Sequence, residues 1–188
     1  MKHFIRIAVY VILAIPTFAQ VPDTFQWLTD GSGYRDIVQG EIVEVTLPAK
    51  TSKVLVSKAL LVPVGTQKPL DIRSYTINNQ GDQVLIYTNT KQVWRYDTRG
   101  DYWVLNLNTK ALRKLGTTLP ESSLMFAKFS PNGQKVAYVS RHNIYSEDLA
   151  GGVVKQLTKD GTDRVINGTF DWVYEEEFDC RDGFRWSD

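Results

Sequence analysis

Residues 73–88 read RSYTINNQGDQVLIYT, and residues 127–140 read AKFSPNGQKVAYVS. In both copies an extended segment enters a glycine turn, and a second, strongly apolar segment of strand-like composition follows. Gly81 and Gly133 occupy the same place in the two copies, about 50 residues apart, and each copy continues into a hairpin pattern. Units of about four strands that recur every 40–50 residues or so are typical of β-propeller blades. The sequence therefore predicts consecutive blades of a propeller.

The rest of the chain continues this pattern of short strands separated by turns. We predict strands at residues 41–47, 53–63, 72–77, 83–89, 101–107, 123–130, 135–140, 143–149 and 153–158. No long amphipathic helix is expected, so the fold class is all-β. A further copy of the repeat is expected to open at residues 184–188, FRWSD, where the sequence breaks off. The prediction is a partial β-propeller of about three four-stranded blades, the N-terminal portion of a longer protein.

Residues 1–19 have the layout of a secretory signal peptide. Lys2 and Arg6 precede an unbroken apolar run at residues 7–15, and the expected cleavage follows Ala19. The alternative is an uncleaved anchor, although the run is short for a membrane span. Residues 20–188 then belong to the propeller. We expect an exported protein of a bacterial periplasm, cell envelope or medium.

Composition and single residues exclude several kinds of function. The net charge of +1 gives no electrostatic case for binding nucleic acid. His142 is the single histidine after the signal peptide and no G-x-S-x-G stretch occurs, so a catalytic triad cannot be assembled. Cys180 is the single cysteine, which leaves a buried free thiol or a pairing with a cysteine elsewhere. These two residues alone do not make a metal site, and we expect no metal and no cofactor.

A run of three glutamates, Glu175, Glu176 and Glu177, stands among aromatic residues in DWVYEEEF, residues 171–178. On a strand these neighbours would point to opposite faces, so convergence on one ligand requires a bend or a short helix. A peptide α-amino group is a cation at neutral pH, and two carboxylates can accept two of its three N–H donors. The alternative is a solvated acidic loop.

A second candidate stretch is KQVWRYDTRGDYW, residues 91–103, where Arg95 and Arg99 lie among aromatic residues. The planar guanidinium of arginine is suited to fixing a carbonyl or a carboxylate. The alternative is an arginine that stacks on a surface aromatic ring or pairs with Asp97 or Asp101.

Together these stretches resemble the dipeptidyl peptidase IV family, the prolyl oligopeptidase-like serine peptidases. The resemblance is carried by DWVYEEEF and by KQVWRYDTRGDYWVLNL at residues 91–107. It is supported by FSPNGQKVAYV at residues 129–139 and by FRWS at residues 184–187. It implies an N-terminal β-propeller followed by an α/β-hydrolase domain beyond Asp188. It also implies an exopeptidase that removes dipeptides from peptide N-termini, with Pro or Ala as the second residue.

The resemblance also assigns roles to individual residues. It implies that Glu176 and Glu177 bind the α-amino group of the substrate and that Arg95 holds a carbonyl near the peptide's amino end. Glu175, Trp94 and Tyr102 are expected to support them. No residue of this chain is expected to be catalytic.

The expected partners are peptides with a free N-terminus, with homodimerisation through the full-length protein. The rival interpretations are a non-catalytic periplasmic propeller that binds or scaffolds, and a tripeptidyl peptidase of the same family.

Overall fold

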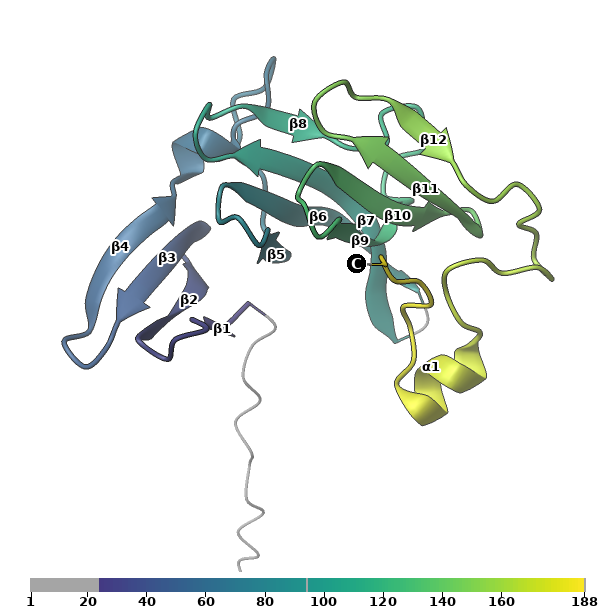
Figure 1. The fold of residues 1–188 in the computed structure, drawn as a ribbon, viewed down its shortest axis with the longest axis horizontal. Coiled ribbons are helices and arrows are strands. Elements are labelled where there is room, and N and C mark those ends of the chain that lie inside the picture. Colours follow the sequence, from purple (N-terminus) through teal and green to yellow (C-terminus); the bar gives the residue numbers. More distant parts are fainter. Residues whose placement is uncertain (1–23, 94, 188) are drawn as a thin grey trace, which may run out of the picture.

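The computed structural model describes residues 24–93 and 95–187, and within them the chain forms three four-stranded antiparallel sheets in sequence order (Figure 1). The predicted signal peptide and Trp94 lie outside the described residues. The first sheet consists of β1 (Gln26–Trp27), β2 (Gly33–Val38), β3 (Glu41–Thr46) and β4 (Thr51–Val56). In Figure 1 the first strand of each sheet faces the inside of an arc and the last strand lies along its outside.

The two copies of the repeat form the second and third sheets. The second sheet consists of β5 (Ser74–Ile77), β6 (Gln83–Val93), β7 (Tyr96–Asn106) and β8 (Leu112–Lys114). The third consists of β9 (Met125–Phe129), β10 (Lys135–Ser140), β11 (Asn143–Asp148) and β12 (Val154–Gln156). The aligned Gly81 and Gly133 both have positive φ, at 74° and 68°, which glycine adopts readily. The predicted repeat is therefore confirmed as two consecutive blades.

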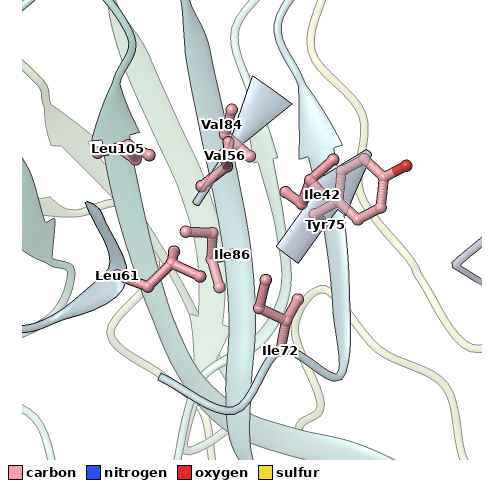
Figure 2. Close-up of a cluster of buried hydrophobic side chains, with 8 residues drawn as sticks. All are labelled: Ile42, Val56, Leu61, Ile72, Tyr75, Val84, Ile86 and Leu105. Carbon is pink, nitrogen blue, oxygen red and sulfur yellow. The ribbon is translucent and has the colours of Figure 1, made fainter. Parts of the chain in front are cut away.

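The core is divided between the sheets, because successive side chains of a strand point to opposite faces. Along β6, Val84 and Ile86 join a cluster between the first and second sheets, shown in Figure 2. Leu85 and Tyr87 join a second cluster, between the second and third sheets. The second sheet is thus apolar on both faces, as a blade between two others must be.

Three predictions about the strands need correction. Residues 53–63 were predicted as one strand, but the chain leaves β4 and forms a 3₁₀ helix, η1 (Lys58–Leu61). β1 and β2 were not predicted, because the charged pair Arg35-Asp36 interrupts the apolar alternation of β2. No strand forms at residues 184–187, where the Trp186 indole donates a hydrogen bond to the Lys128 carbonyl of β9 at 3.2 Å.

Two excursions leave the sheets, and the sequence did not predict how far either extends. The hairpin of β6 and β7 continues past the sheet, with register shifts between Thr88 and Lys91 that mark a bulge. The second excursion runs from residue 168 to residue 183 and is closed by a β-bridge between Thr169 and Asp182. It carries α1 (Trp172–Phe178), which Figure 1 places apart from the sheets. Within the described residues no helix is long and apolar enough to cross a membrane.

Candidate functional site

The acidic run forms the short helix α1, because both of its ends are capped. The Asp171 carboxylate accepts hydrogen bonds from the backbone N–H groups of Val173 and Tyr174, at 3.1 and 3.2 Å. At the other end Asp179 adopts a left-handed conformation with φ of 54°, and its N–H bonds back to the Tyr174 carbonyl. A short helix is one of the two shapes that would let neighbouring glutamates act on one ligand.

The helix brings Glu176 and Glu177 to the same pocket as Arg95. The pocket has a volume of about 420 Å³ and is lined by Arg95, Trp172, Glu176 and Glu177. Arg95 reaches it from the tip of the β6–β7 hairpin, more than 70 residues earlier in the sequence. Its Nε lies 2.7 Å from the Glu176 Oε2 atom. The structure therefore unites the two stretches that the sequence had singled out separately.

The charges of the pocket do not balance. Glu176 is paired with Arg95, whereas Glu177 is exposed and has no ion-pair partner among the described residues. One arginine against two carboxylates leaves a net negative charge, which suits a monovalent cation. Arg95 contacts Glu176 through Nε, and its guanidinium carries four further N–H donors that can serve an acceptor on a ligand.

Glu175, unlike its two neighbours, does not line the pocket and is 6% exposed. Its Oε1 atom has no hydrogen-bond partner among the described residues. Burial raises the pKa of the Glu175 carboxyl, the nearby Arg181 guanidinium lowers it, and the Glu176 carboxylate raises it further. Glu175 therefore faces the body of the excursion and not the pocket.

A second contact fixes the helix excursion against the hairpin. The Arg181 guanidinium lies over the Tyr96 ring, 3.6 Å from its centroid, and also pairs with the Asp179 carboxylate at 2.5 Å. Sequence reasoning missed Arg181, because its partner ring is distant in the chain and no local pattern joins them. With the Arg95–Glu176 pair, this contact holds the two excursions together at their tips.

The remaining predicted residues lie elsewhere. Tyr102 does not line the pocket: it is buried in the core between the second and third sheets, stacked on Tyr87 at 4.6 Å. Trp94 is outside the described residues. Cys180 is exposed, which corrects the expectation of a buried thiol. No group of three or more His, Cys, Asp or Glu side chains that could hold a metal ion occurs in the described parts of the chain.

Comparisons with known proteins give a consistent result. Residues 78–188 match the family described as "Dipeptidyl peptidase IV (DPP IV) N-terminal region". A Schizosaccharomyces pombe protein named as a dipeptidyl aminopeptidase is 33% identical over 165 residues, which cover 86% of this chain and 20% of that protein. A Chaetomium globosum protein named as a dipeptidyl-aminopeptidase B is 35% identical over 95 residues, which cover 50% of this chain and 10% of that protein.

A solved structure agrees with these relatives. The crystal structure of Porphyromonas gingivalis dipeptidyl peptidase 4 superposes with a TM-score of 0.73 and 25% identity. The match covers 84% of this chain and 22% of that one. The matched part of this chain thus spans about a fifth of the Schizosaccharomyces pombe protein and about a fifth of the Porphyromonas gingivalis structure.

Proposed function

Because this chain belongs to the dipeptidyl peptidase IV family, we propose that it is the substrate-binding part of the propeller of a serine-type dipeptidyl peptidase. Such an enzyme would remove dipeptides from peptide N-termini, with Pro or Ala second. The single observation that carries the proposal is the pocket in which an unpaired Glu177 stands beside the Arg95–Glu176 ion pair. The export expected from residues 1–19 is part of the same proposal.

In the proposed complex, the α-amino group of the peptide lies between the carboxylates of Glu176 and Glu177. Each carboxylate accepts one charge-assisted hydrogen bond from the ammonium group. Arg95 keeps its contact with Glu176 through Nε and donates from a terminal nitrogen to a carbonyl near the amino end. The pocket then neutralises its excess negative charge with the one positive charge of the ligand.

This arrangement acts as a ruler for the position of cleavage. A peptide anchored by its amino end presents its second peptide bond at a fixed distance from the pocket. Binding energy at the remote ammonium group is thereby converted into correct placement of the reacting carbonyl. The same arrangement explains why an exopeptidase would reject peptides whose amino end is blocked.

The test is Glu177→Gln in the full-length protein, which keeps the side chain's shape and removes its charge. For a peptide with a free amino end we expect kcat/KM to fall about 30- to 1000-fold, since the partner charge is left unpaired. N-acetylation of the peptide should cause a similar loss in the wild type. The matched control is Glu41→Gln on β3, whose amide oxygen can still accept from the Lys58 N–H.

Unchanged kcat/KM in Glu177→Gln would rule out the proposed role of this carboxylate. If the wild-type protein binds free and acetylated peptides equally and cleaves neither, the rival propeller that only binds or scaffolds is the better interpretation. Binding of both peptides, measured by calorimetry, separates these outcomes.

A further inference from the structure

A second pocket opens on the same hairpin that carries Arg95. It has a volume of about 520 Å³ and lies between the second and third sheets. Lys91 and Arg99 line it from β6 and β7, and Arg141 and His142 line it from the turn between β10 and β11. Its acidic members are Glu121 and Asp163, both exposed. Three permanent cations thus face two carboxylates, the reverse of the balance in the Glu176–Glu177 pocket.

The three cations of this second pocket have no ion-pair partner, unlike most other arginines of the described chain. Lys91 and Arg99 are paired directly across β6 and β7, a placement that is unfavourable for like charges. Neither they nor Arg141 forms an ion pair with a described residue. Six other described arginines each lie within 4 Å of a carboxylate: Arg35, Arg73, Arg95, Arg113, Arg181 and Arg185.

The turn that carries Arg141 is also unusual for its backbone. Arg141 and His142 both have positive φ, 49° and 60°, in the two-residue connection between β10 and β11. Such a turn ordinarily contains Asn and Gly, which tolerate this conformation at less cost. Arg141 thus lines the pocket from a strained backbone position, together with the unpaired Lys91 and Arg99.

The two pockets are close enough for one peptide. Arg95 and Arg99 are four residues apart on one hairpin, so their Cα atoms are at most about 14 Å apart. A peptide of about four or five extended residues spans the same distance. We propose that the second pocket binds a carboxylate of the peptide whose amino end occupies the Glu176–Glu177 pocket. This inference rests on the proposed function, and it assigns a preference for peptides with an acidic group near the fourth residue.

The experiment compares peptides that differ only in charge. The first has Glu as its fourth residue, the second has Gln there, and both have amidated C-termini. The third has Gln at that position and ends at its fifth residue with a free carboxylate. The bond after the second residue is N-methylated to slow cleavage, and Kd is measured by calorimetry with the full-length protein. The wild type should bind the first about three- to tenfold more tightly than the second, a preference that falls with salt.

Arg99→Gln and Arg141→Gln should each bring the Glu-to-Gln affinity ratio close to one. Arg164→Gln is the matched control, because Arg164 is exposed and unpaired among the described residues but does not line this pocket. The proposal is overturned if the wild type binds the first and the third peptide no more tightly than the second. It is also overturned if Arg164→Gln lowers the Glu-to-Gln affinity ratio as much as Arg99→Gln and Arg141→Gln do. Tighter binding of the third peptide alone assigns the carboxylate to the peptide's C-terminus.

The amino end is tested separately with N-acetylated versions of the same peptides. Acetylation should weaken all of them equally, which reports on the Glu176–Glu177 pocket. If acetylation has no effect but the Glu-to-Gln ratio persists and depends on Arg141, the proposed amino-end site is wrong and the carboxylate site stands.

Discussion

Glu175, Glu176 and Glu177 are chemically identical neighbours, and the structure gives each a different environment. Glu175 is buried, Glu176 is paired with Arg95, and Glu177 is exposed with no described cation beside it. A helix turns by about 100° per residue, so adjacent side chains cannot share one direction. The sequence predicted that the run had to bend or coil before two carboxylates could meet a ligand. The packing of the whole excursion decides which carboxylate is buried, so the three-glutamate run alone could not predict it.

Glu175→Gln should make the protein more stable at neutral pH. Burial raises the pKa of the Glu175 carboxyl above its ordinary 4.5, so the folded state holds its proton more tightly than the unfolded state does. Stability from this group is therefore greatest below about pH 4.5 and falls as the pH rises through the folded pKa. Gln cannot ionise, so the variant avoids that loss. Urea denaturation at pH 4 and pH 7 should show a gain at pH 7 alone.

The exposed Glu177 provides the comparison for this measurement. Glu177→Gln should leave the free energy of unfolding nearly unchanged at both pH values, because surface substitutions of this kind have small effects. A lower stability of Glu175→Gln at pH 7 would mean that its carboxylate is held in the charged form, chiefly by Arg181.

The helix α1 has seven residues, too few to be stable alone in water. Its caps and its contacts with the hairpin must therefore hold it. The sequence offered a short helix only as one of two shapes that would let the glutamates converge, because the segment is too short to show an amphipathic repeat. In contrast, β10 was predicted with its observed bounds, because KVAYVS is almost continuously apolar and follows a glycine turn.

Asp171→Ala tests whether the cap positions the carboxylates. Loss of an N-cap carboxylate costs about 0.5–2 kcal/mol of helix stability. Since Asp171 does not line the pocket, we expect KM for a peptide with a free amino end to rise about three- to tenfold while kcat changes little. Asp171→Ser should restore most of the loss, because serine also caps. If serine is as harmful as alanine, the charge of Asp171 matters and its capping hydrogen bonds do not.

The complete site exists only where the excursions of two neighbouring sheets meet. Arg95 belongs to the second sheet's hairpin, whereas Glu176 and Glu177 lie on an excursion that follows the third sheet, so two blades contribute to the pocket. Alternation along β6 and the period of the repeat were enough to predict the blades. The contacts between excursions were not predictable, because the Arg95–Glu176 and Tyr96–Arg181 pairs join positions with no common periodicity. The family resemblance proposed that Arg95 and the two glutamates share a substrate, and the geometry places them together.

A buried carboxylate, Glu147 on β11, links the second and third sheets. Its Oε2 atom accepts hydrogen bonds from the Tyr138 hydroxyl at 3.0 Å and from the Gly116 N–H at 2.9 Å. Its Oε1 atom lies 3.4 Å from the Arg113 guanidinium. Burial and the neighbouring Glu147 both raise the pKa of Tyr138, so its hydroxyl stays protonated and remains a donor. Two of these partners come from the second sheet or its edge, which makes the network a connection between blades.

Glu147→Ala should therefore destabilise the protein far more than the loss of a surface pair. Loss of the Glu147 carboxylate leaves the buried Tyr138 hydroxyl and the buried Gly116 N–H without their acceptor, at a cost of about 1–3 kcal/mol for each group. The matched control is Glu44→Ala, which breaks the Arg35–Glu44 pair on the first sheet, where the Glu44 side chain is 27% exposed against 5% for Glu147. That loss should be about 0–1 kcal/mol. Because Glu147 connects the two blades whose excursions form the pocket, Glu147→Ala should also weaken binding of peptides with a free amino end. If Glu147→Ala and Glu44→Ala lower the free energy of unfolding equally in urea, other contacts fix the blades. The same follows if Glu147→Ala lowers stability but leaves the Kd for these peptides unchanged.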